Sequence, residues 1–176
     1  KRYGMNDSGS YKKQAEQAYD RALARGQMTV SDYYDQMQSV KISMTCGIDD
    51  GRARTRGLIT KLYQYYSKGV AGVPVVRLCS ETSHYGSSPG DRGWGCGYKN
   101  IQMLLAAMCN DPKFKNSVFN GSTNMPSISK IQQLIEKAWE EGYDEQGREQ
   151  LGGKIYNTRK WIGATEVMAF FTSLKV

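Results

Sequence analysis

The sequence predicts an α+β chain that is mostly helical. Six segments of the 176 residues place apolar side chains three and four positions apart, as on the buried face of an amphipathic helix. One short β-branched run, VPVVRLCS, lies between glycine-rich stretches and is typical of a strand. A hydrophobic content of 39% in a chain of this length suits one globular core, with at most an appended arm.

The first two predicted helices form a hairpin. The stretch SGSYKKQAEQAYDRALARG puts Tyr11, Ala15 and Tyr19 on one stripe, with serines before the helix and a glycine after it. The stretch TVSDYYDQMQSVKISM repeats the apolar pattern from Val30 to Met44 after only a few residues. A connection this short predicts that the two helices pack side by side.

The remaining elements follow in order along the chain. A third amphipathic helix is predicted from Leu58 to Tyr66, and the strand VPVVRLCS comes next. Residues 81–95 are dense in Gly, Ser, Pro and Asp, which is typical of either an ordered functional loop or a mobile one. Helical spacing then resumes after this loop, and helices are predicted at 96–111, 127–141 and 164–173.

Charge gives little information about partners. The chain holds 24 Lys and Arg against 17 Asp and Glu, and most of the excess lies before residue 70. No block of five or six basic residues occurs, so a solvated surface is favoured and nucleic acid is expected to be an unlikely partner. No apolar run approaches about 18 residues, and no signal-peptide pattern opens the sequence, so neither a membrane span nor export is expected.

Four cysteines and a single histidine limit the metal chemistry. Cys46, Cys79, Cys96 and Cys109 form no CxxC pair, and the histidine is His84. These spacings match neither the common zinc sites nor a secreted disulfide framework. We therefore expect reduced thiols, no metal, no cofactor and a cytoplasmic and nuclear location. The apolar neighbours of Cys79 and Cys109 predict two small buried hydrophobes, and Cys46 stays ambiguous.

Cys96 differs from the other cysteines because it stands where a glycine-rich loop becomes a helix, in GDRGWGCGYKNIQMLL. The unpaired N–H groups and the dipole at a helix N-terminus stabilise a thiolate. Gly93, Gly95 and Gly97 would let an extended peptide lie close to the sulfur, and Trp94 is expected to wall the approach. The alternative is a tight loop-to-helix turn with an inert cysteine.

The same string resembles the nucleophile motif of the ubiquitin-fold-modifier-protease-like cysteine peptidases, a papain-type family. The stretches YGMNDSGSYKKQ, GIDDGRARTRGLI, IEKAWEEGYDEQG and WIGATEV resemble a ubiquitin-specific branch of it, so the resemblance covers nearly the whole chain. It implies the N-terminal portion of a papain-like peptidase fold with a helical arm. It also implies a deubiquitinating thiol protease that hydrolyses isopeptide bonds of polyubiquitin, with preference for chains linked through ubiquitin's lysine sixty-three.

The resemblance also implies roles for particular residues. Cys96 matches the family's nucleophile, and Asp144 and Trp161 match positions that line the ubiquitin-facing side of the cleft. Residues 1–70 match a helical arm that binds ubiquitin, and residues 71–176 match the N-terminal half of the peptidase domain. The plainer alternatives are that Asp144 is a turn residue and that Trp161 packs against the last helix.

One feature departs from the family pattern. A papain-like site needs a histidine to take the thiol proton, and in this family the histidine follows the cysteine by a long interval. No histidine follows Cys96, and His84 lies 12 residues before it. We therefore expect the sequence to hold roughly the first half of a peptidase domain. Two alternatives stay open, a protease for the ubiquitin-fold modifier and a non-catalytic ubiquitin-binding fragment.

Overall fold

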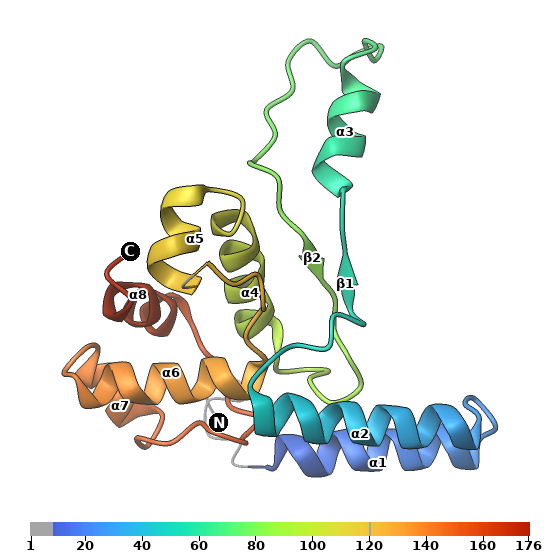
Figure 1. Cartoon of the computed structure of the whole chain (residues 1–176), viewed down its shortest axis with the longest axis vertical. Helices are drawn as coiled ribbons and strands as arrows, with labels where there is room; N and C mark the ends of the chain where they lie inside the picture. The colour runs from blue at the N-terminus through green and yellow to red at the C-terminus, as the bar shows by residue number, and fades with distance from the viewer. Residues whose placement is uncertain (1–8, 120) are drawn as a thin grey trace.

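The computed structural model describes residues 9–119 and 121–176, so the first residues of YGMNDSGSYKKQ lie outside the described part. Within the described part the chain is mostly helical, with one small sheet, as predicted (Figure 1). The elements in chain order are α1 (Tyr11–Ala24), α2 (Val30–Cys46), β1 (Arg54–Thr55), α3 (Leu58–Tyr66), β2 (His84–Tyr85), α4 (Cys96–Met108), α5 (Pro112–Phe119), α6 (Ile128–Glu140), α7 (Glu145–Gln150) and α8 (Ala164–Ser173). None of the described helices is long and apolar enough to cross a membrane.

The core lies where α4, α6 and α8 meet. The middle of α4 contributes Tyr98, Ile101 and Leu105, which are at most 1% exposed. α6 packs against both α4 and α8, and its apolar stripe is buried along its whole length. Burying one large apolar side chain contributes roughly 1.5–3 kcal/mol, so this junction is the main stabilising contact of the chain.

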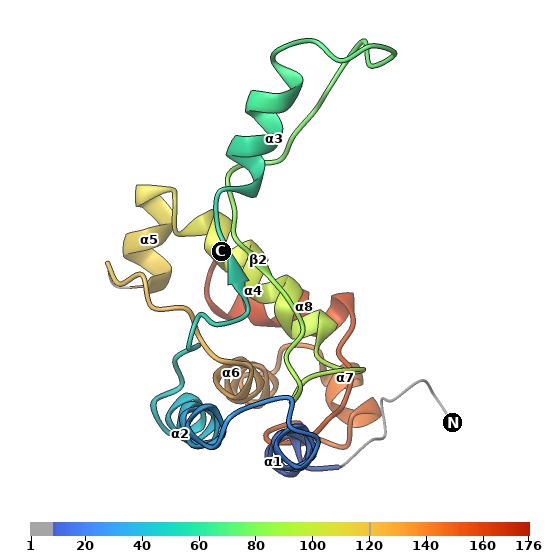
Figure 2. The same cartoon turned by 90° about the vertical axis from the view of Figure 1, so that its right-hand side faces the viewer.

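The predicted helical hairpin is confirmed, since α1 and α2 lie side by side (Figures 1 and 2). Ser10 caps α1 by accepting a hydrogen bond from the backbone of Lys13, and Thr29 forms a capping box with Asp32 at the start of α2. α1 buries Tyr11 and two further residues, whereas α2 has no buried residue. α1 therefore packs on the loop before α4, and the C-terminal end of α2 contacts α6, where Ser127 Oγ donates to Ser43 O.

Residues 51–80 extend away from the body, and we call this segment the projection. Its base is the antiparallel pair of β1 and β2, in which Arg54 lies opposite Tyr85 and Thr55 opposite His84. α3 and the chain that returns from it stand above this pair (Figures 1 and 2). No residue of the projection is buried.

Some predictions of local structure were wrong. VPVVRLCS is not a strand: residues 74–79 are extended and unpaired, and Val73 makes only an isolated bridge to Val70. Pro74 cannot donate to a ladder, and no neighbouring strand lies beside this segment in the described part of the chain. The two-residue strands were missed because they are too short to show alternation. α5 was missed because Pro112 was interpreted as the end of a helix, although proline is also well suited to a first helical position.

Candidate active site

Cys96 is the first residue of α4, and its side chain is exposed. The N-cap residue Gly95 has no side chain to cap the helix, so its backbone carbonyl alone accepts a hydrogen bond there, from Lys99 N at 3.0 Å. The uncapped N–H groups and the helix dipole place partial positive charge at this end of α4. A thiolate and a developing oxyanion would both be stabilised there.

The loop before Cys96 is ordered by one buried carboxylate. Asp91 is 2% exposed and accepts hydrogen bonds from Ser87 Oγ (2.8 Å), Ser88 N (3.0 Å) and Ser88 Oγ (2.6 Å). Its backbone carbonyl accepts from Gly95 N at 2.8 Å, directly before the nucleophile position. Of the two predictions for residues 81–95, the ordered loop is the one that the structure shows over this stretch.

The same carboxylate joins the loop to the helix. Lys99 Nζ lies 3.5 Å from Asp91 Oδ2, and the two side chains are 8% and 1% exposed. Lys99 is one turn after Cys96 on α4, so the ion pair fixes the loop on both sides of the thiol. Removing one partner of a buried ion pair leaves an uncompensated charge, which makes this contact difficult to replace. Neither Asp91 nor Lys99 was predicted from the sequence as a site residue.

Trp94 does not wall the approach to Cys96, because its side chain is only 4% exposed. Its ring lies edge-on between Tyr11 (centroid distance 5.2 Å) and Tyr98 (5.6 Å), and its Nε1 donates to Gly90 O at 3.2 Å. The indole is part of the core and supports the loop from within. The expected role of Trp94 in substrate contact is therefore replaced by a packing role.

The glycines around the thiol also serve packing more than substrate access. A Cβ on Gly95 would lie 2.6 Å from the Asp91 side chain, and one on Gly97 would lie 2.6 Å from Ile162 Cγ1. Those two positions are filled by the protein itself. Only Gly93, with φ +88°, has open space beside it. The expectation of an open, glycine-lined approach therefore holds for one of the three positions.

Trp161 lies at the same end of α4 as Cys96. Tyr98 donates its hydroxyl hydrogen to Lys160 O at 3.0 Å, and the Ile162 carbonyl would be 2.9 Å from a Cβ on Gly97. These contacts hold the backbone on both sides of Trp161 against the first turn of α4. Burial raises the pKa of the Tyr98 hydroxyl, which keeps it a neutral donor. Trp161 itself remains 38% exposed, which leaves part of the indole available to a partner.

Asp144 caps α7 in a left-handed conformation with φ 53°. Its Oδ1 accepts a hydrogen bond from Gly147 N at 3.0 Å, so the geometry agrees with the alternative that Asp144 is a turn residue. A Cβ on Gly147 would collide with Asp144 Oδ2 and would lie 2.8 Å from Glu166 Oε1, so the two carboxylates flank Gly147. Glu166 Oε2 in turn accepts a hydrogen bond from the backbone N–H of Gly163 at 2.5 Å. Gly163 is two residues after Trp161. Asp144 and the backbone that follows Trp161 thus both lie near Glu166 at the start of α8.

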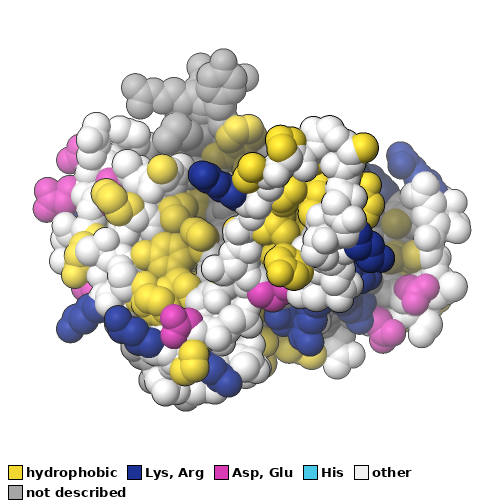
Figure 3. All heavy atoms as spheres, turned by 90° about the horizontal axis from the view of Figure 1, so that it is seen from above, with side chains coloured by type: hydrophobic (Ala, Val, Ile, Leu, Met, Phe, Trp, Pro, Cys, Tyr) yellow, Lys and Arg dark blue, Asp and Glu magenta, His cyan; other side chains and the backbone are white. Residues whose placement is uncertain are grey.

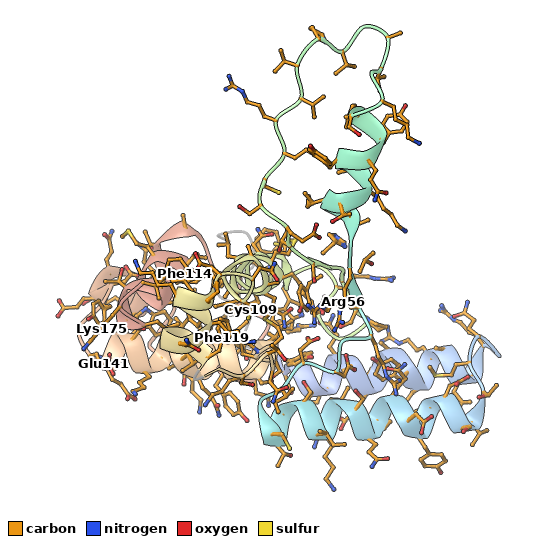
Figure 4. The ribbon with its side chains drawn as sticks, turned by 45° about the horizontal axis from the view of Figure 1, so that its top comes forward. Arg56, Cys109, Phe114, Phe119, Glu141 and Lys175 are labelled. Carbon is orange, nitrogen blue, oxygen red and sulfur yellow. The ribbon has the colours of Figure 1, made fainter. Side chains whose placement is uncertain are left out.

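The other titratable groups of interest lie away from the Cys96 end of α4. His84 is on β2, with its backbone opposite Thr55 and its side chain exposed. Cys109 caps the far end of α4, about 20 Å along the helix from Cys96; Figure 4 labels it. Burial raises the pKa of the Cys109 thiol. Cys79 is exposed on the projection, so the prediction of a buried cysteine there was wrong, because nothing in the described structure covers that segment.

Comparison with known proteins gives related sequences along the whole chain. The model of peptidase family C78 matches residues 71–176. Zinc finger-containing ubiquitin peptidase 1 is 40% identical in Homo sapiens and 39% identical in Bos taurus over all 176 residues. Ubiquitin carboxyl-terminal hydrolase mug105 of Schizosaccharomyces pombe is 44% identical over 88 residues, which are 49% of this chain and 34% of that protein. The chain spans 30% of the length of the zinc finger-containing relatives.

Proposed function

The chain belongs to peptidase family C78, and on this premise we propose that it is a cysteine-type deubiquitinase with Cys96 as its nucleophile. The names of its relatives, ubiquitin peptidase and ubiquitin carboxyl-terminal hydrolase, support ubiquitin as the substrate. The observation that carries the proposal is the placement of Cys96. An exposed thiol stands at the uncapped start of α4, at the end of a loop fixed by a buried carboxylate.

The proposed reaction is hydrolysis of the isopeptide bond after ubiquitin's C-terminal glycine. The thiolate of Cys96 attacks the carbonyl carbon, and the oxyanion that forms accepts hydrogen bonds from N–H groups at the start of α4. The lysine amine leaves with a proton, and water then hydrolyses the thioester. The first step requires a group that accepts the thiol proton. His84 is exposed on β2, and we expect His84→Ala to leave the reactivity of Cys96 unchanged.

Two surfaces are proposed to hold ubiquitin. Trp161 and Asp144 would contact its C-terminal region, because each lies near the start of α8 and Trp161 is partly exposed at the thiol end of α4. The helical region of residues 1–70 would contact its globular body through the α1–α2 hairpin. α2 supports this assignment, since Val30 and Tyr34 are 60% and 67% exposed.

The direct test compares two modifiers as probes. Ubiquitin and the ubiquitin-fold modifier would each carry an electrophile in place of the C-terminal carboxylate, and adduct formation would be followed by gel shift. We expect the ubiquitin probe to react, Cys96→Ala to abolish the adduct and Cys46→Ala to leave it unchanged. Faster reaction with the modifier probe would favour a protease for that modifier. Ubiquitin binding without any adduct would favour a non-catalytic binding fragment.

Preference among chain types is a finer part of the proposal. We expect polyubiquitin linked through ubiquitin's lysine sixty-three to be cleaved faster than polyubiquitin linked through its other lysines. Cleavage by the 176-residue chain should be slow, because a helix N-terminus alone stabilises a nearby anion by only about 0.3–1 kcal/mol. Comparable cleavage of all linkages would remove this part and leave the assignment of Cys96 intact.

A further inference from the structure

The positive charge of the chain is concentrated in the projection. Residues 51–80 contain six Lys and Arg and no Asp or Glu, whereas the other 146 residues contain 18 basic and 17 acidic residues. The projection therefore carries nearly all of the net charge of +7. A segment that stands away from the body with cations of one sign creates a local field that attracts polyanions.

Most of these cations are available to a partner. Arg56, Lys61, Lys68 and Arg77 have exposed side chains and take part in none of the ion pairs of the described residues. Glu81, the first carboxylate after the projection, is already occupied at the start of α3, where it accepts from Thr60 N (3.1 Å) and Thr60 Oγ1 (2.6 Å). The positive charge above this point is not neutralised by a neighbouring carboxylate in the described structure.

Aromatic rings alternate with these cations. Tyr63 and Tyr65 are 67% and 59% exposed. Lys61, Tyr65 and Lys68 follow one another at intervals of four and three residues, which places them along one side of α3 and its end. Seen from above, Lys and Arg side chains lie around the hydrophobic side chains of the projection (Figure 3). An exposed tyrosine between lysines offers a ring face on which a base can stack.

The base of the projection holds a polar cavity of about 650 Å³, whose lining combines Arg54, Arg56 and Tyr85 with the carboxylates of Asp49, Asp50 and Glu81. Figure 4 labels Arg56 at this position, between β1 and α3. Tyr85 is 2% exposed, yet its hydroxyl has no hydrogen-bond partner in the described structure. Because the lining holds both cations and carboxylates and the Tyr85 hydroxyl is enclosed by protein, this cavity is not part of the proposed binding surface.

We propose that the projection binds single-stranded nucleic acid. Phosphates pair with Arg56, Lys61 and Lys68 along α3 and with Arg77 on the chain that returns from it, and bases stack on Tyr63 and Tyr65. A merely acidic polypeptide would use the cations but not the exposed ring faces, which is why the strand is the better fit. The sequence-based expectation against nucleic acid treated the basic residues as dispersed, whereas the structure sets 51–80 apart from the acidic residues of α1 and α2.

The test measures binding of a fluorescent oligothymidylate of about 20 nucleotides to the 176-residue chain by anisotropy. With four phosphates neutralised, the affinity should fall about 50-fold between 50 and 200 mM salt. The variant Lys61→Gln/Lys68→Gln should reduce the slope of log affinity against log salt by about half. Tyr65→Ala should weaken binding about tenfold at constant charge, because one stacked base is lost.

The matched control is Lys12→Gln/Lys13→Gln, which removes the same charge from α1 and should leave the salt slope near that of the parent chain. Equal losses in the two double variants would overturn the assignment to the projection. Polyglutamate that displaces the oligonucleotide at equal charge concentration, together with an inert Tyr65→Ala, would overturn nucleic acid in favour of an acidic polypeptide. Circular dichroism of each variant checks that the helices are retained.

Discussion

The region around Cys96 and the projection contain the same kinds of local element but differ in how much of each helix is buried. Each joins a glycine-containing loop to an amphipathic helix, yet α4 buries six of its residues and α3 buries none. Around Cys96 the polar groups of Asp91 and Lys99 are buried and paired. On the projection the cations and aromatic rings face solvent. Substitutions of buried residues near the thiol should therefore change stability and reactivity together, whereas substitutions of exposed side chains on the projection should change binding alone.

The largest effect is expected at Asp91. Asp91→Ala leaves Lys99 buried without its partner and releases the turn at Ser87 and Ser88, so we expect a loss of about 3–5 kcal/mol in the free energy of unfolding. Urea denaturation of the purified chain measures it.

The control for Asp91 is an exposed ion pair. Glu141, labelled in Figure 4, lies 3.6 Å from Lys137 with both side chains solvated. Glu141→Ala should change stability by less than about 1 kcal/mol. Similar stabilities of the two variants would show that the buried pair does not hold the loop.

Two glycines give the next comparison. Gly97→Ala forces the backbone at Ile162 away from α4, and we expect a loss of about 1–3 kcal/mol with slower labelling of Cys96. Gly57→Ala, at the start of α3, has open space around it but keeps a φ of +72°, so it should cost about 1–2 kcal/mol and leave labelling unchanged. The labelling rate is the measurement, and equal rates in both variants would contradict the close approach at Gly97.

Substitution of Trp161 tests whether its side chain contributes to ubiquitin binding or to packing. Because its indole is 38% exposed, Trp161→Ala should slow the reaction with the ubiquitin probe about tenfold, as expected for an interface aromatic. The melting temperature should fall by less than about 4 °C, which corresponds to roughly 1 kcal/mol for a domain of this size. A large drop in melting temperature with a normal labelling rate would return Trp161 to the core.

The smallest effect on stability is expected on α2. Tyr34 is 67% exposed, so Tyr34→Ala should change the free energy of unfolding by no more than about 0.5 kcal/mol. If residues 1–70 contact ubiquitin, the same variant should weaken ubiquitin binding severalfold in a calorimetric titration. Labelling of Cys96 by a small alkylating agent should stay unchanged. Unaltered ubiquitin affinity would argue against this part of the arm.

The helices were predictable because their apolar spacing and caps are local features. Ser10, Gly26 and the stripe through Tyr19 define α1 without any tertiary contact. The position of Cys96 at the start of α4 follows from the same logic, since the glycine-rich loop gives way there to apolar residues at helical spacing. Secondary structure around the nucleophile therefore required no knowledge of the rest of the chain.

What surrounds Cys96 was not predictable, because it depends on residues far away in sequence. Trp94 appears in a polar, glycine-rich string, and its burial requires Tyr11, 83 residues earlier, as well as the nearby Tyr98. The sequence does not show that Ile162 lies beside Gly97 and fills the space next to it. The only local hint of Asp91 was its place after the turn residues SSPG, and its pairing with Lys99 needed the loop conformation.

The central claim is that Cys96 is the nucleophile that reacts at ubiquitin's C-terminus. The most direct test is to react the chain with the ubiquitin probe, digest the adduct and locate the modified cysteine by mass spectrometry. Cys46 and Cys79 are also exposed and serve as internal controls for simple accessibility. We predict that the adduct maps to Cys96 alone and is lost in Cys96→Ala. An adduct on Cys46 or Cys79, or one that survives Cys96→Ala, would contradict the account.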